Sequence, residues 1–214
     1  MIIGINGYMG SGKDTVGRMI QYIDSRSNAS FEDWSKPNLY RGYDISPLSM
    51  YEDEKNSWQI KKFAGKLKEI ASLMTGIPIE KFEDQEFKKT NMSEEWNNHG
   101  MPMTVRQFLQ KLGTDAIRDG LHSNAWVNSL LSDYQPFLSR WIITDTRFPN
   151  EGKSIKERGG IIIKVNRPSL TSTDRHISET ALDDWEFDEV IENDNGLDKL
   201  LYLTEQILIK HKLI

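Results

Sequence analysis

The chain has 214 residues, with 27 lysine and arginine residues against 32 aspartate and glutamate residues, so its formal net charge is −5 at pH 7. This length predicts one domain with some additional chain, and an apolar content of 37% is enough for a hydrophobic core. The absence of cysteine excludes a disulfide scaffold, a thiol nucleophile and cysteine-ligated zinc. The negative charge argues against a general nucleic-acid coat, but not against small anionic substrates, because the field inside a pocket need not follow the net charge.

No segment of the sequence has the character of a membrane span or an export signal. The longest apolar runs are a few residues long, whereas a spanning helix needs roughly 20. The first seven residues contain neither a basic region nor an extended apolar region. We therefore expect a cytoplasmic protein with no membrane partner.

The spacing of apolar residues changes repeatedly between the period of a strand and that of a helix. Strands are predicted, in chain order, at residues 2–5, 58–63, 140–144, 161–165 and 189–191. Helices are predicted at residues 14–24, 64–75, 105–112, 124–134, from about 150, and 197–210. Strands that alternate with helices favour an α/β fold with a parallel sheet.

Two polar stretches interrupt this alternation. Residues 25–57 are rich in serine and asparagine, and we expect them to form an irregular insertion or flap. A second polar stretch at about 84–103 precedes Thr104, which we predict to cap the helix that follows. Gly76 is expected to end the helix at 64–75.

The strongest motif lies between the first strand and the first helix, where Gly7, Gly12 and Lys13 satisfy the phosphate-loop pattern G-x-x-x-x-G-K. Glycines let successive backbone N–H groups surround phosphate oxygens, and the helix N-terminus attracts the anion. The alternative is a glycine-rich turn without a ligand. The motif predicts an ATP-binding segment made of Gly10, Ser11, Gly12, Lys13, Asp14 and Thr15.

The residue after Lys13 departs from the usual motif. Asp14 stands where serine or threonine is common, and the hydroxyl comes one place later, at Thr15. This order is similar to that of nucleoside monophosphate kinases such as adenylate kinase, in which a threonine stands two residues after the lysine. We predict that Thr15 helps to hold Mg²⁺.

A second carboxylate follows the predicted strand at 140–144. In an open α/β sheet such a strand end faces the ligand crevice, so Asp145 is expected to hold Mg²⁺, directly or through water, or to contact substrate. Arg147 is expected to neutralise charge on the transferred phosphoryl group, which makes Lys13, Asp145 and Arg147 the predicted catalytic residues. Glu151 is either a site residue or a first-turn carboxylate that favours the helix dipole.

Five segments resemble, in order, segments of the bacteriophage deoxynucleoside monophosphate kinases, within the P-loop nucleoside monophosphate kinase superfamily. They are residues 11–15, 106–115, 124–127, 144–151 and 176–179. The resemblance covers most of the chain except the two polar stretches.

This resemblance implies ATP-dependent phosphorylation of deoxynucleoside 5′-monophosphates to diphosphates with Mg²⁺, which would supply dNTP synthesis for DNA replication in the host cytoplasm. It implies a single domain over residues 1–214, in which a parallel-sheet core carries a monophosphate-binding segment within about 25–103 and a lid at about 167–180. The implied partners are a dNMP and ATP, with no nucleic acid, and the family suggests a homodimer.

The resemblance also implies which positions line the monophosphate site. They are Arg106, Gln110, Gly113, Thr114, Trp126, Asp145, Arg147 and Glu151. The spacing of the first three is consistent with one helix face, and we expect Gly113 to end that helix. Trp126 is expected either to stack on a base or to belong to the core.

Basic residues in the implied lid are further candidates. Arg167, Arg175 and His176 are expected to grip the transferred phosphoryl group, although the segment around His176 is equally consistent with a helix start capped by Ser178. A lysine run at residues 61–68 either attracts an anionic substrate or forms a solvated face.

Two other functions are consistent with the phosphate loop. One is a related small-molecule kinase such as a dephospho-coenzyme A kinase. The other is a non-catalytic nucleotide-binding switch, but a second strand that ends in a carboxylate and an arginine is more than binding alone requires.

Overall fold

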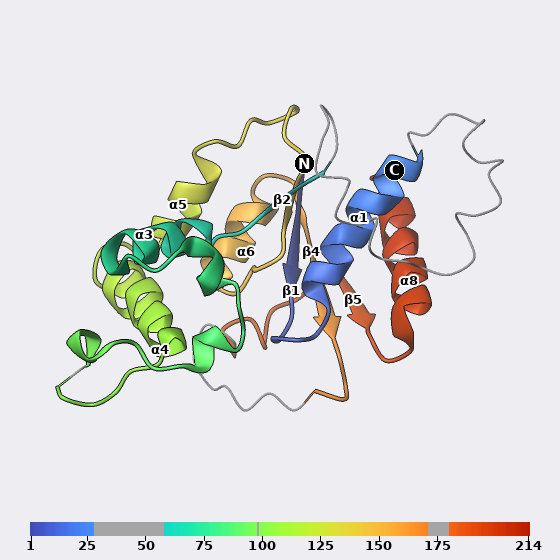
Figure 1. The fold of residues 1–214 in the computed structure, drawn as a ribbon. Helices are drawn as coiled ribbons and strands as arrows, with labels where there is room; N and C mark the ends of the chain where they lie inside the picture. Colours follow the sequence, from blue (N-terminus) through green and yellow to red (C-terminus); the bar gives the residue numbers. More distant parts are fainter. Residues whose placement is uncertain (28–57, 98, 171–179) are drawn as a thin grey trace. The chain divides into compact units, whose positions relative to one another are not determined.

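The computed structural model describes residues 1–27, 58–97, 99–170 and 180–214 (Figure 1). The chain divides into two compact units, which we describe separately: unit 1 comprises Met1–Lys61 and Tyr134–Ile214, and unit 2 comprises Lys62–Asp133. The predicted flap lies almost entirely outside the described residues. The expectation of a single kinase domain stays a prediction.

Unit 1 contains a five-stranded sheet in which every pairing is parallel. Its strands are β1 (Ile2–Asn6), β2 (Gln59–Lys61), β3 (Trp141–Ile143), β4 (Ile161–Asn166) and β5 (Glu189–Glu192). The order β2-β3-β1-β4-β5 confirms the α/β fold of a P-loop kinase. The second strand is shorter than predicted, because the backbone turns towards the next helix with a hydrogen bond from Gly65 N to Lys62 O.

Two helices cover one face of this sheet. Helix α1 (Lys13–Ser27) lies beside α8 (Gly196–Lys210), as Figure 1 shows. Ile3 and Ile5 of β1 are fully buried against residues of both helices. The apolar residues of α1 recur at intervals of three and four, so they form one continuous stripe towards the sheet.

Helix α6 (Pro149–Lys156) packs against β1 and β4 on the opposite face. Gly4 of β1 permits this close approach, because a Cβ atom there would lie 2.7 Å from Ile155 Cδ1 of α6. Unit 1 therefore has three layers, with the core on both faces of the sheet.

The strand order decides where a ligand can bind in unit 1. Strand β1 is central: β2 and β3 lie on one side of it, and the chain then crosses to β4 and β5 on the other side. Parallel strands end at one common edge, and open α/β sheets bind ligands at such a reversal of strand order. The loop from β1 to α1 lies at this point.

Unit 2 is helical and has its own core. Its elements are α3 (Gly65–Thr75), η2 (Ile79–Phe82), η3 (Phe87–Lys89), η4 (Glu94–Trp96), α4 (Val105–Gln110), η5 (Lys111–Asp119) and α5 (Ala125–Leu131). The predicted polar stretch at 84–103 folds within this unit, because Phe87, Met92 and Met103 join Phe82 and Phe108 in one apolar cluster.

The predicted helix caps of unit 2 are confirmed at Thr104 and Gly76. Thr104 Oγ1 accepts a hydrogen bond from Gln107 N at 3.2 Å, and Gly76 ends α3 in the left-handed conformation with φ 72°. The expectation that Gly113 ends a helix is wrong: the helix continues as the π-helical η5 to Asp119. A Cβ on Gly113 would lie 2.9 Å from Leu67 Cδ2, so its small size serves packing against α3.

Candidate active site

The phosphate loop has the backbone conformation that its glycines predict. Gly10 and Gly12 have φ values of 82° and 103°, in the left-handed region that other residues rarely adopt. A Cβ on Gly12 would also lie 2.6 Å from the amide nitrogen of Asn193. Both the conformation and the available space therefore require glycine at position 12.

Lys13 and Ser11 lie inside this loop. Lys13 is 8% exposed, and its Nζ donates a hydrogen bond to Tyr8 O at 3.2 Å. The hydroxyl of Ser11 is buried and has no hydrogen-bond partner among the described residues. Buried hydroxyls usually have a partner, and a phosphate oxygen would supply one. The loop therefore fits the phosphates of a nucleotide.

A cavity of about 620 Å³ opens beside the loop, entirely within unit 1. Lys13 and Thr15 line it from the loop and α1, while Leu197 and Leu200 line it from α8. One region of its wall thus carries the loop's polar groups, and another is apolar. Such a cavity suits a ligand with a charged phosphate end and an apolar ring.

Arg167, a predicted lid residue, lies next to the loop, and its contact with phosphates stays a prediction. Its Nη1 donates to Gly10 O at 3.3 Å, and the residue lines the same cavity. The other two predicted lid residues, Arg175 and His176, lie outside the described residues.

Asn193 is a cavity residue that the sequence analysis did not identify. It follows β5, and its Nδ2 donates to Ser11 O at 2.7 Å, which ties the far edge of the sheet to the phosphate loop. Its own backbone N–H bonds to Asn166 O at 2.7 Å. The available signal was the polar run 193–195 directly after a predicted strand, the same pattern that identified Asp145.

The end of β3 is held next to the phosphate loop by two side-chain hydrogen bonds. Thr144 Oγ1 donates to Asp14 Oδ1 at 2.9 Å, and Asn6 Nδ2 donates to Thr146 O at 2.9 Å. Asp145 stands between these two anchored residues and is 8% exposed. The structure thus brings the segment of Asp145 to the first turn of α1, where Thr15 lies.

The donor set of this region fits Mg²⁺ held together with nucleotide phosphates. Among the described residues, no group of three or more histidine, cysteine, aspartate or glutamate side chains could form a metal cage. Magnesium is commonly bound by one or two carboxylates, substrate phosphates and water. Asp145 and the hydroxyl of Thr15 are residues of the kind that this mode of binding requires.

Glu151 has a clear structural task. Its carboxylate is 2% exposed and accepts hydrogen bonds from Arg147 N at 2.7 Å and Phe148 N at 3.1 Å. It therefore satisfies N–H groups at the start of α6, in line with the alternative that it serves the helix. The same bonds fix the backbone of Arg147. Contacts of either residue with substrate stay predictions.

The other predicted monophosphate residues all lie in unit 2. Arg106 and Gln110 are on α4, and Arg106 Nη2 donates to Gln85 Oε1 at 3.2 Å. Gly113 and Thr114 are in η5, and Trp126 of α5 is 6% exposed with its indole N–H bonded to Gly113 O at 2.9 Å. The structure thus gathers the five in one unit, and their contacts with a nucleotide stay predictions.

Comparison with known proteins decides the family. Residues 44–203 match the family model described as deoxynucleotide monophosphate kinase. The chain belongs to the deoxynucleotide monophosphate kinase family. The resemblance predicted from the sequence is thereby confirmed, together with the class of enzyme, a kinase. The phosphate loop precedes the matched residues, so it supports the same class independently.

Individual relatives agree with this family. A putative deoxynucleotide monophosphate kinase of Acanthamoeba polyphaga mimivirus is 32% identical over 134 residues, which are 57% of this chain and 67% of the relative. The deoxynucleotide monophosphate kinase of Escherichia phage RB69 is 32% identical over 121 residues, 55% of this chain and 50% of the relative. The deoxynucleoside-5′-monophosphate kinase of Escherichia phage T5 is 24% identical over 185 residues, 73% and 72% of the two chains.

The chain spans about half the length of the RB69 relative, so family membership extends to the matched region. Within the part of the chain that the structure describes, no helix is long and apolar enough to cross a membrane.

Proposed function

We propose that this protein transfers the γ-phosphoryl group of ATP to a deoxynucleoside 5′-monophosphate and so forms the diphosphate. The observation that carries the proposal is the cavity of unit 1 that the phosphate loop, the residues after β4 and β5, and α8 line together. A non-catalytic nucleotide-binding switch would also need this cavity. Membership of a kinase family additionally implies a second substrate, which accepts the phosphoryl group.

The chain's own residues have distinct tasks in this proposal. The loop N–H groups and Lys13 bind the ATP phosphates, and Arg147 offsets the charge that spreads over the phosphoryl group during transfer. Thr15 and Asp145 would hold Mg²⁺, which supplies charge neutralisation on the phosphates. Arg106, with a planar guanidinium suited to phosphate oxygens, binds the acceptor from unit 2.

The physiological setting follows from the reaction. Diphosphates of deoxynucleosides are precursors for dNTP synthesis, and we infer that the protein acts in the host cytoplasm on small molecules, without nucleic acid. A homodimer remains part of the proposal and is tested by the molecular mass in solution.

The proposal is tested by a coupled assay of ADP formation from ATP with every dNMP, every NMP and dephospho-coenzyme A, with and without Mg²⁺. We expect turnover with at least one dNMP, and none without Mg²⁺. Turnover with dephospho-coenzyme A alone would assign the protein to the other kinase class. ATP binding without transfer to any acceptor would favour the nucleotide-binding switch.

A further inference from the structure

Four cationic side chains from three segments of unit 2 lie near the turn at residues 83–88, where Lys68 pairs with Glu83 and Arg106 bonds to Gln85. Lys62 precedes α3, Lys68 belongs to α3, Lys88 belongs to η3 and Arg106 belongs to α4. The charges of Lys62, Lys68 and Arg106 all act on Lys88. We propose that Lys88 is a binding residue for the acceptor's phosphate group and that these four cations form a site for a phosphate monoester dianion. This inference rests on the proposed function.

Two polar contacts hold Lys68 and Arg106 against the turn that precedes Lys88. Lys68, which is 8% exposed, forms an ion pair with Glu83. Arg106 donates to Gln85, two residues further along the same turn. The lysine run is thus not a single solvated face, because Lys68 points into the unit while Lys66 pairs with Glu69 on the exposed surface.

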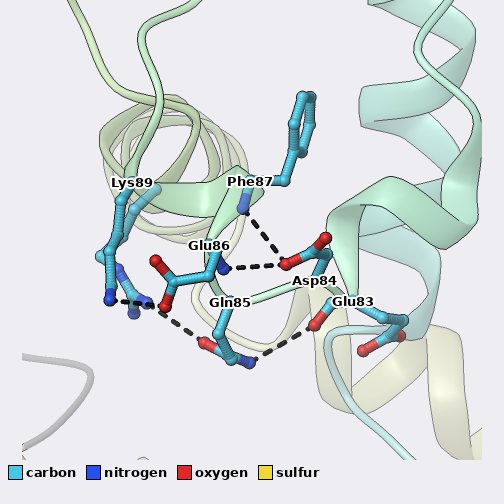
Figure 2. A network of polar contacts seen from close by, with 7 residues as sticks. Glu83, Asp84, Gln85, Glu86, Phe87 and Lys89 are labelled. Atoms are coloured by element: carbon cyan, nitrogen blue, oxygen red, sulfur yellow. Dashed lines mark hydrogen bonds and ion pairs between the residues drawn. The ribbon is translucent and has the colours of Figure 1, made fainter.

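The turn itself is fixed by Asp84 (Figure 2). Its Oδ1 accepts hydrogen bonds from Glu86 N at 2.8 Å and Phe87 N at 3.2 Å, which sets the start of η3. Lys89 then pairs with Glu86 at 2.7 Å, and its side chain is 63% exposed. The adjacent lysines therefore differ: Lys89 has a carboxylate partner, whereas Lys88 is half-buried among cations.

The charges around Lys88 are unbalanced. Lys62, Lys68 and Arg106 act on it as cations, and Glu83 and Asp84 are the carboxylates that interact with it, so four cations face two carboxylates. Burial, and then Lys68, lower the pKa of Lys88 to about 8, with smaller contributions from Arg106 and Lys62. In the described part of the chain, no hydrogen bond or ion pair to Lys88 Nζ is present. A bound dianion would supply the missing negative charge.

A phosphate monoester matches this arrangement better than a carboxylate does. It carries close to two negative charges at pH 7 and three acceptor oxygens, so several cations bind it at once. The acceptor nucleotide of the proposed reaction carries such a group, and we therefore assign its phosphate to this cluster.

The test compares Lys88→Gln and Lys88→Arg with Lys89→Gln, a matched control at the neighbouring position. Kinetics at saturating ATP and at saturating dNMP give the two KM values. Lys88→Gln should raise the KM for the dNMP about tenfold or more, the usual effect of losing a charged hydrogen bond, and leave the KM for ATP within about twofold. Lys89→Gln should match the wild type. An unchanged dNMP KM, or an equal rise for ATP, would overturn the proposal.

The pH dependence separates binding by Lys88 from a structural effect. Because Lys88 loses its proton near pH 8 in the free protein, the dNMP KM of the wild type should rise between pH 7.5 and 9.5. Lys88→Arg stays charged across that range, so its KM should stay level. A similar rise in Lys88→Arg would assign the pH dependence to another group and contradict the proposal. If Lys88→Gln fails to fold, the comparison of the wild type with Lys88→Arg still tests the proposal.

Calorimetric titration with inorganic phosphate and with each dNMP distinguishes a failed site from a failed kinase. If no dNMP is phosphorylated but dNMP binding depends on Lys88, the proposed reaction fails and the binding site stands. If dNMPs are phosphorylated and Lys88→Gln binds them as the wild type does, the site fails and the reaction stands. Binding of inorganic phosphate alone would contradict a nucleotide as the occupant.

Discussion

The hydroxyl of Thr144, at the end of β3, donates a 2.9 Å hydrogen bond to Asp14, at the start of α1. Asp14 is the residue by which the loop departs from the usual phosphate-loop motif. Its carboxylate joins the first turn of α1, which carries Lys13, to the end of β3, which precedes Asp145. An aspartate at this position therefore stabilises the contact between α1 and the end of β3.

Thr144→Val should remove this bond with little change of shape. Thr144 is fully buried, so we expect a loss of about 1 kcal/mol in the free energy of unfolding and a severalfold lower kcat. Thermal unfolding and steady-state kinetics measure the two effects. Thr204→Val is the control, because Thr204 is equally buried and donates to Leu200 O at 2.8 Å within α8. Equal losses of activity in both variants would refute a specific role for Thr144.

Lys13→Ala should reduce kcat by a factor of about 100 or more, the effect of losing a charge aimed at the transferred phosphoryl group. The fold should persist, because Lys13 lies outside the hydrophobic core of unit 1, in the phosphate loop, where its Nζ donates a hydrogen bond to Tyr8 O at 3.2 Å. Circular dichroism checks the fold and the ADP assay checks turnover. Near-normal rates in a folded variant would contradict phosphoryl transfer at this loop.

Asn193→Ala should weaken ATP binding without a direct change at the reacting groups. The substitution removes the bond to Ser11 O at 2.7 Å that holds the loop, so the loop has to be ordered by the nucleotide itself. We expect the KM for ATP to rise about fivefold to tenfold and the KM for the dNMP to change less. Asn195→Ala, two residues away on the surface, is the control. A selective rise in the dNMP KM would place Asn193 elsewhere in the mechanism.

Arg106→Ala should raise the KM for the dNMP about tenfold or more, through the loss of a charged contact, and affect the KM for ATP less. Lys111→Ala provides a control on the same helical segment, because Lys111 is exposed and its pairing distance to Asp115 is 3.6 Å. The reverse pattern of KM values would move Arg106 out of the acceptor site.

Lys88→Gln should stabilise the protein in the absence of substrate. The pKa of Lys88 falls from 10.5 to about 8 on folding, so the charged form is less stable in the folded state. The penalty is complete below pH 8 and disappears as the pH rises through 10.5. With solvent screening, we expect a gain on the order of 1 kcal/mol at pH 7, and none near pH 11. Urea unfolding at both pH values measures it, and lower stability at pH 7 would show that the charge is compensated within the protein.

Much of the fold was predictable because its signals are local. The β-branched run at residues 2–5 and the helical spacing after Asp14 each depend on near neighbours in the chain. The same holds for Gly76, whose left-handed conformation ends α3. Gly113 does not end its helix as the sequence predicts, because glycine also permits close packing, and the contact that requires it here comes from Leu67, 46 positions earlier.

The phosphate loop, the alternation of strands and helices and the kinase family were determined by the sequence itself. Short motifs of fixed spacing are sufficient to specify them. The role of Asn193 and the pairing of Asp14 with Thr144 depended on the tertiary structure, because strand order brings these distant positions to one edge. The cationic surroundings of Lys88 likewise arise only when three segments of unit 2 pack together. The burial of a side chain and the charges around it are properties of the assembled fold. The sequence alone therefore does not show which of two adjacent lysines becomes buried.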